Sequence, residues 1–164
     1  MDHVTATFES RGAAENALIA LEQAGIREDQ LSMIVTEESR GNKLRVEEKT
    51  RADEGAAAGA TFGGVTGAIL GSVLAAGTIA VPGLSLVVAG PLAAGLAGLG
   101  AGAASGGLIG ALIGAGIPEH EAKLYHDEIK NGNILLAVDT DDSAEKNRVE
   151  ELLRNAKAYN VTAV

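Results

Sequence analysis

The stretch that decides how this chain is built is residues 55–71, which read GAAAGATFGGVTGAILG. Glycine recurs in it at every fourth position, and the same pattern recurs after a break at Val81-Pro82-Gly83. On a helix of about 3.6 residues per turn, such a run leaves a groove without Cβ atoms, which a second backbone can approach closely. We interpret both runs as glycine zippers and their glycines as candidate self-association residues: Gly55, Gly59, Gly63, Gly67 and Gly71, then Gly98, Gly102, Gly106, Gly110 and Gly114.

The region around the two runs carries no charge. Residues 55–118 contain no Asp, Glu, Lys or Arg, so all 13 basic and 22 acidic residues lie in the flanks. We predict that residues 55–117 form a Gly/Ala-rich helical hairpin, with helices over 55–79 and 91–116. Glycine costs a lone helix about 1 kcal/mol per residue relative to alanine, so this hairpin needs cover from a membrane or from other copies of itself.

Two environments for the hairpin stay open. Both helices are long enough to cross a hydrocarbon core of about 30 Å, which would leave the two flanks on the same side of the membrane. Their Ala/Gly-rich composition makes them weak candidates for insertion, and a soluble homo-oligomer with a shared zipper core is the alternative. A solvated, disordered linker fits poorly with the apolar content of the segment.

The N-terminal flank has the pattern of a strand, a helix and a second strand. Residues 4–8 and 31–36 are the predicted strands, and the helix between them starts at an N-cap Ser10 and stops at Gly25. Four residues at helical spacing form its apolar face: Ala14, Ala17, Leu18 and Leu21.

The C-terminal flank repeats this order. A helix over residues 118–131 begins at Pro118 and carries Ala122, Tyr125 and Ile129 on its apolar face. The apolar run 134–138 is typical of a strand that is covered on both faces. A last helix, capped by Asp142 or Ser143, leads to an edge strand over residues 160–164.

The two flanks together predict an α+β fold. Without residues 37–132 the order is β-α-β followed by β-α-β, which is the ferredoxin-like pattern of an antiparallel sheet with two helices on one face. Another small α/β sandwich is the alternative. Residues 1–38 and 132–164 would form the ferredoxin-like unit, 39–54 a charged linker, 55–117 the glycine-zipper hairpin and 118–131 a connecting helix. We expect the flanks to fold together without the hairpin.

Composition and motifs argue against several functions. The formal net charge of −9 disfavours nucleic-acid binding, which needs clustered basic residues. The chain has no cysteine, which excludes disulfides, thiol catalysis and cysteine-held metals. Residues 139–145 resemble a calcium loop only weakly, because Ala144 occupies the glycine position, and a turn before a capped helix explains them better. We predict no enzymatic activity and no catalytic, cofactor or metal site.

Several motifs together resemble a bacterial family. They are Glu54-Gly55-Ala56-Ala57-Ala58-Gly59-Ala60, then Ala80-Val81-Pro82-Gly83, then Gly110-Ala111-Leu112-Ile113-Gly114-Ala115-Gly116-Ile117-Pro118-Glu119. With the preceding β-α-β pattern, this order resembles the general stress proteins, or low-temperature-induced proteins, of bacteria. The resemblance implies a non-enzymatic, stress-associated protein, and it brings no catalytic motif with it.

The expected function is self-assembly during stress. We expect a protein that associates through its glycine-zipper hairpin and is inserted in or associated with a membrane. Its partners would be further copies of itself and the lipid bilayer, and no nucleic acid. The alternative is a soluble homo-oligomeric scaffold, or a module that binds a small molecule or signal through the ferredoxin-like domain, an idea that rests on fold analogy. The N-terminus MDHVTATFES shows no secretory pattern, so the expected location is the bacterial cytoplasm or cytoplasmic membrane.

Overall fold

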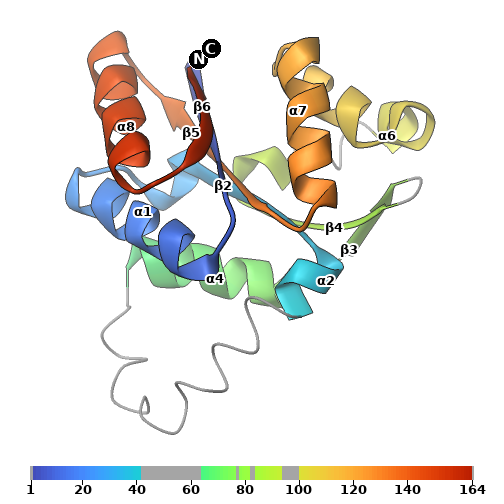
Figure 1. Cartoon of the computed structure of the whole chain (residues 1–164), viewed down its shortest axis with the longest axis horizontal. Helices are drawn as coiled ribbons and strands as arrows, with labels where there is room; N and C mark the ends of the chain where they lie inside the picture. The colour runs from blue at the N-terminus through green and yellow to red at the C-terminus, as the bar shows by residue number, and fades with distance from the viewer. Residues whose placement is uncertain (1, 42–63, 77, 82–83, 94–99, 164) are drawn as a thin grey trace, which may run out of the picture.

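The fold is built on one antiparallel sheet with helices on both faces (Figure 1). The computed structural model describes residues 2–41, 64–76, 78–81, 84–93 and 100–163. The sheet is 6-stranded, in the order β3-β4-β2-β5-β1-β6, and every neighbouring pair of strands is antiparallel. The predicted α+β class is therefore confirmed.

Strands and helices follow one another along most of the chain. In order, the elements are β1 (Asp2–Phe8), α1 (Arg11–Gln23), η1 (Glu28–Gln30), β2 (Leu31–Thr36), α2 (Glu37–Ser39), α4 (Val65–Ala75), β3 (Thr78–Val81), β4 (Leu84–Ala89), α6 (Gly100–Gly114), α7 (Glu119–Lys130), β5 (Ile134–Thr140), α8 (Ser143–Asn155) and β6 (Tyr159–Ala163).

Two helices begin at the caps that the sequence predicts. The Ser10 side chain accepts a hydrogen bond from the Ala13 backbone N–H at 3.3 Å, at the start of α1. Asp142 accepts two backbone N–H groups, those of Ala144 and Glu145, each at 2.8 Å. The first turn of a helix leaves such N–H groups without a backbone partner, so these side chains fix where α1 and α8 begin.

The strand β5 lies between β1 and β2, which do not pair with each other. It pairs with β1 from Asp2↔Thr140 to Phe8↔Ile134, and with β2 from Leu31↔Val138 to Ile34↔Leu135. All its residues from Ile134 to Val138 are buried, as the uninterrupted apolar run predicts for a strand covered on both faces.

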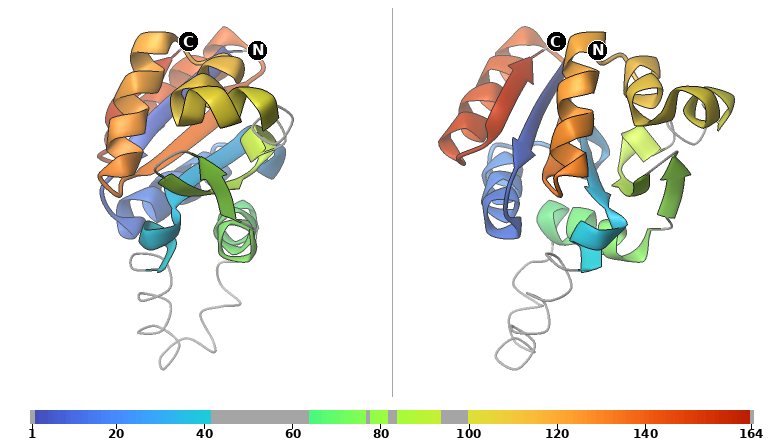
Figure 2. Two further views of the ribbon diagram at one scale, coloured as in Figure 1. Left: turned by 90° about the vertical axis from the view of Figure 1, so that its right-hand side faces the viewer. Right: turned by 45° about the vertical axis from the view of Figure 1, so that its right-hand side comes forward.

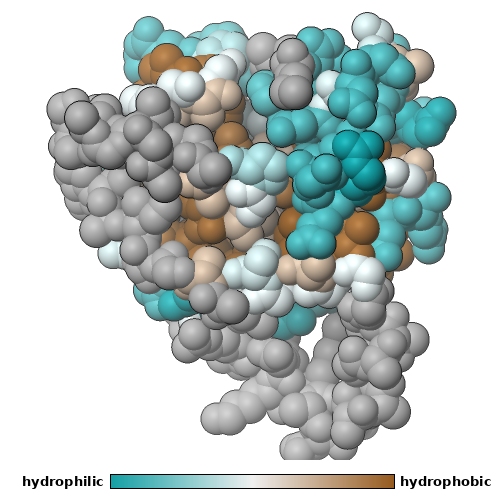
Figure 3. Space-filling view, turned by 180° about the vertical axis from the view of Figure 1, so that it is seen from behind, coloured by the Kyte–Doolittle hydropathy of each residue, from teal (hydrophilic) through white to brown (hydrophobic). Residues whose placement is uncertain are grey.

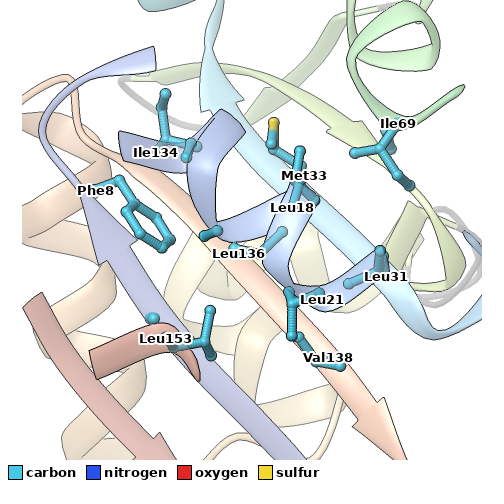
Figure 4. Close-up of a cluster of buried hydrophobic side chains, with 14 of the residues drawn as sticks. Phe8, Leu18, Leu21, Leu31, Met33, Ile69, Ile134, Leu136, Val138 and Leu153 are labelled. Carbon is cyan, nitrogen blue, oxygen red and sulfur yellow. The ribbon is translucent and has the colours of Figure 1, made fainter. Parts of the chain in front are cut away.

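The first hydrophobic cluster lies between the sheet and the helices α1, α4 and α8 (Figure 4). Every second residue of a strand points into it, because side chains alternate between the two faces of a sheet. Its larger members are Phe8, Leu18, Leu21, Leu31, Met33, Ile69, Ile134, Leu136, Val138 and Leu153. Ile69 and Val73 of α4 are 1% and 0% exposed, so part of the predicted hairpin belongs to this core.

The helices α6 and α7 lie on the opposite face of the sheet (Figure 2), and the second hydrophobic cluster lies beneath them. It contains Ile34, Leu86, Val88, Leu108, Leu112, Tyr125, Ile129 and Leu135 among others. The predicted pattern places two helices on one face, and α1 and α8 both contribute to the first cluster. Residues of the Gly/Ala-rich region and of α7 cover the second face, a position that the sequence analysis did not assign to them.

The region predicted as a helical hairpin is built differently. Between α4 and α6 the chain forms the strands β3 and β4, and β4 pairs with β2 from Met33↔Ala89 to Thr36↔Leu86. Ile79, Val81, Val87 and Val88 are β-branched and favour an extended backbone, and the edge of β2 offers partners for their backbone groups. The two predicted helices are therefore found in part: α4 lies within 55–79 and α6 within 91–116, whereas Thr78 and Ile79 belong to β3.

The remaining predicted segments are found in part. The helix predicted over 118–131 is α7, with Ala122, Tyr125 and Ile129 buried, while most of the linker 39–54 lies outside the described residues. Within the described ranges, no helix combines the length and the apolar character needed to cross a bilayer.

Seen from behind, hydrophilic side chains gather over the half of the molecule that holds α1 and α8 (Figure 3).

Candidate functional site

The predicted self-association glycines are divided between two helices. Gly55, Gly59, Gly63 and Gly98 lie outside the described residues. Gly67 and Gly71 lie on α4, and the last four, Gly102, Gly106, Gly110 and Gly114, lie on α6.

On α4, Gly71 faces away from the sheet, and Gly67 is partly buried. The residues Thr66, Ile69 and Val73 of α4 are buried in the protein interior, whereas Gly71 is exposed. A Cβ atom built on Gly71 would meet no described atom within 4 Å apart from the backbone of its own helix, and the φ of Gly71 is not in the left-handed region. The fold of a single copy therefore does not require glycine at this position.

The last turns of α6 also have one buried face and one exposed face. Leu108, Ala111 and Leu112 are buried against the sheet, while Ile113 is 42% exposed and Gly114 is exposed beside it. The helix is kinked at Gly107, which has a φ of 61° and a ψ of −157°. This kink interrupts the straight groove that the spacing of four predicts.

The glycine faces of α4 and α6 do not pack against each other. The buried residues of α4 belong to the first hydrophobic cluster, and those of α6 belong to the second, so the sheet separates the two helices. A zipper between them within one copy is therefore not formed in the described residues. The described residues instead include an exposed Gly71 on α4 and an exposed Gly114 on α6, on opposite sides of the sheet.

The N-terminus of α4 is capped by a glutamate from another helix. Glu22, in the last turn of α1, accepts the backbone N–H groups of Val65 at 3.3 Å and Thr66 at 3.2 Å. The Thr66 hydroxyl donates a third hydrogen bond to this carboxylate, at 2.9 Å. These bonds, with that of the Thr66 side chain the strongest, lower the pKa of Glu22 below its ordinary value.

The neighbouring Gly64 makes room for this carboxylate. Its φ is 106°, and a Cβ atom at this position would lie 2.1 Å from Glu22 Oε1. A side chain at residue 64 would therefore force the Glu22 carboxylate away from its present position at the N-terminus of α4.

The C-terminus of α4 is held by an arginine. Arg40 Nη1 donates to the carbonyl of Ala76, the C-cap residue, at 2.7 Å, and Nη2 donates to Glu37 Oε1 at 2.5 Å. The Arg40 side chain is only 10% exposed, and its Nε has no partner among the described residues. We call Glu22 and Arg40 together the α4 clamp.

A group of polar side chains lies where α7 crosses β1. The hydroxyls of Tyr125 and Thr5 are 2.5 Å apart and buried, and His3 Nδ1 lies 2.7 Å from Asp139 Oδ1. One turn before Tyr125, Glu121 is 7% exposed; its Oε1 lies 3.5 Å from His120 Nε2, and its Oε2 has no hydrogen-bond partner among the described residues. Burial raises the pKa of both Glu121 and Tyr125.

These groups do not form a metal centre in the part of the chain that the structure describes. No cluster of three or more His, Asp and Glu side chains there could hold an ion. In the segment that weakly resembles a calcium loop, Asp142 caps α8, and Glu145 accepts from the Asp141 N–H at 2.8 Å.

Sequence reasoning missed the α4 clamp. Glu22 carried one usable signal, because an acidic side chain in the last turn of a helix opposes the helix dipole, which suggests a partner elsewhere. Arg40 carried none, since a lone arginine after a strand reads as a solvated side chain.

Comparison with known proteins gave no identification. No family model matches the chain, and neither a curated protein nor a solved structure matches it.

Proposed function

We propose that this chain is a non-enzymatic protein that self-assembles through the outward glycine faces of α4 and α6. The observation that carries the proposal is Gly71, a helical glycine with open space around it. Alanine there would favour the helix by up to about 1 kcal/mol without a clash, so the fold of one copy gains nothing from this glycine. A neighbouring backbone that approaches closely does gain from it.

The position of the two faces supports assembly beyond a dimer. They lie on opposite sides of the sheet, so one copy can contact two neighbours at once. On α6, the exposed Ile113 beside Gly114 adds an apolar side chain to the contact. Neither α4 nor α6 contains a charged residue that would oppose contact between two uncharged faces.

The scaffold that presents these faces is, in our proposal, a ferredoxin-like unit. The strand order β6-β1-β5-β2, with every pair antiparallel and with α1 and α8 on one face, supports this assignment. In this proposal β3 and β4 extend the unit's sheet beyond β2. The role in bacterial stress comes from the family resemblance described above and stands as part of the proposal.

The test is the mass of the assembly. Gly71→Leu and Gly114→Leu place a branched side chain in each face, and Asn147→Leu on the exposed side of α8 is the matched control. Native mass spectrometry and light scattering should show assemblies of lower mass for both glycine variants. The control should form assemblies of the same mass as the wild-type protein. An assembly of unchanged mass and heat stability in both glycine variants would contradict the proposal.

Membrane association is the second candidate, because residues 55–118 contain no charged residue. Flotation of the full chain with vesicles of neutral and of anionic lipid tests it. If the protein stays with the vesicles after a carbonate wash, it is embedded in the bilayer. If it remains at the bottom of the gradient, membrane association is excluded.

A further inference from the structure

The helix α4 cannot cap itself. It has 11 residues, its N-cap is Gly64, and it has no acidic side chain in the first turn and no basic side chain in the last. Helices of this length are marginal on their own in water, and two internal glycines, Gly67 and Gly71, weaken this one further. Its helical state therefore depends on groups that other elements supply.

Glu22 and Arg40 supply these groups with the favourable sign at each end. The carboxylate of Glu22 lies at the N-terminus, where the helix dipole is positive, and the guanidinium of Arg40 lies at the C-terminus, where the dipole is negative. Both residues lie outside the charge-free region of the chain. The flanking unit thus provides charges that the Gly/Ala-rich region lacks.

We propose that the α4 clamp is a release device: it keeps α4 on the sheet, and its opening frees α4 to associate with a second copy of the chain. This inference rests on the proposed self-assembly. It adds that the assembling surface is partly stored in the folded molecule.

Opening the clamp would expose two apolar surfaces at once. One is the inner face of α4, with Ile69 and Val73, and the other is the area of α1 and the sheet beneath it, including Leu21 and Leu31. Surfaces of this kind drive association when they reach solvent. A second copy is the occupant that fits, because a released α4 offers another copy the same uncharged helix and the same Gly64 notch for Glu22.

Three substitutions in the full chain open the clamp by different means. Glu22→Gln removes the charge at the N-terminus of α4, and Arg40→Gln removes the charge at its C-terminus. Thr66→Val removes only the hydroxyl that donates to Glu22, and Thr66→Ser keeps that hydroxyl as a matched control. Glu151→Gln, on the exposed side of α8, controls for the loss of one carboxylate.

Hydrogen exchange and native mass spectrometry give the two readouts. In Glu22→Gln, the amides of α4 should exchange roughly fivefold faster, as expected for the loss of a helix cap, while those of α8 keep their rates. Thr66→Val and Arg40→Gln should act in the same direction. The mean mass of the assemblies should rise in each of these three variants and stay unchanged in Thr66→Ser and Glu151→Gln.

Two results would overturn the inference. Unchanged exchange of α4 in Glu22→Gln and Thr66→Val shows that there is no clamp. Faster exchange of α4 at constant mass shows that its release does not cause association. The Gly71→Leu and Gly114→Leu comparison on the native assembly decides the proposed function separately, because a side chain at Gly71 meets no described atom within 4 Å and Gly114 lies on α6, across the sheet from the clamp.

Discussion

Folding shifts the pKa values of two glutamates in opposite directions. Hydrogen bonds from Thr66 and Val65 lower the pKa of Glu22, whereas burial raises the pKa of Glu121. The ionised form of Glu22 and the protonated form of Glu121 are therefore the forms that stabilise the folded state. The two residues give the stability of the protein two pH dependences that can be separated by mutation.

Glu22→Gln should destabilise the protein at neutral pH and much less in acid. Because the pKa of Glu22 is lowered on folding, its contribution is present above the unfolded value of about 4.5 and is lost as the pH falls through the folded value. We expect a loss of about 1 kcal/mol at pH 7, the typical value of a helix cap, measured by urea denaturation. An equal loss at pH 7 and at pH 3 would contradict this account.

Glu121→Gln should stabilise the protein at neutral pH. The raised pKa means that the contribution of Glu121 is present below about pH 4.5 and is lost as the pH rises through the folded value. An amide avoids burying a charge whose Oε2 has no partner in the described part of the chain, which we expect to be worth about 1 kcal/mol at pH 7. Glu119→Gln, two residues away and exposed, is the control, and urea denaturation at pH 7 and pH 4 compares the three proteins. A destabilised Glu121→Gln at pH 7 would show that the charge is needed.

Glycine has three different roles inside and at the ends of the helices and strands of this molecule. Gly71 lies in open space, Gly64 leaves room for a side chain, and Gly90 leaves room for the backbone. A Cβ atom on Gly90 would lie 2.0 Å from the carbonyl oxygen of Leu31, and the φ of Gly90 is 88°. The sequence does not distinguish these roles, because all three residues lie in the same Gly/Ala-rich region.

The alanine variants of these glycines should therefore rank in a fixed order. Gly71→Ala should raise the free energy of unfolding by up to about 1 kcal/mol through helix propensity. Gly64→Ala should lower it, because the clash is with the movable carboxylate of Glu22 and φ is left-handed. Gly90→Ala should lower it most, by about 3 kcal/mol or more, because backbone atoms cannot move aside. Thermal unfolding measures all three, and a Gly90→Ala protein as stable as wild type would refute the ranking.

The flanking elements could be predicted because their signals are local. Ser10 and Asp142 cap helices a few residues away, and the run from Ile134 to Val138 shows by itself that β5 is covered on both faces. The strands β3 and β4 could not be predicted, because they lie between two glycine runs with helical spacing and the edge of β2 that receives β4 lies far away in the chain. The clamp was missed for the same reason, since Glu22 and Thr66 are 44 residues apart.

At the scale of the whole molecule, the sheet is a single structure that needs cover on both faces. The Gly/Ala-rich region contributes Ile69 and Val73 to one cluster and Leu108 and Leu112 to the other. We therefore no longer expect the flanks to fold by themselves. Removing the inserted elements would uncover Ile34 and other residues of the second cluster.

A chain that joins residues 1–38 directly to 132–164 should not unfold cooperatively. It lacks α4, α6 and α7, so we expect a molten product that binds ANS and has lost near-UV circular dichroism. The full chain, measured beside it, should show one sharp transition. A sharp transition in the shortened chain would mean that its four strands and two helices are sufficient.

The position of β5 between β1 and β2 has a consequence for synthesis on the ribosome. When β1 and β2 leave the exit tunnel, the strand that joins them has not been made, because β5 ends at Thr140. Roughly a hundred further residues must be translated first, which takes on the order of 5–20 s at ordinary rates of synthesis. During that interval the apolar strands and the charge-free segment emerge together without their partners. The nascent chain is then a natural client for ribosome-associated chaperones, and arrest of translation before residue 134 should leave it bound to them.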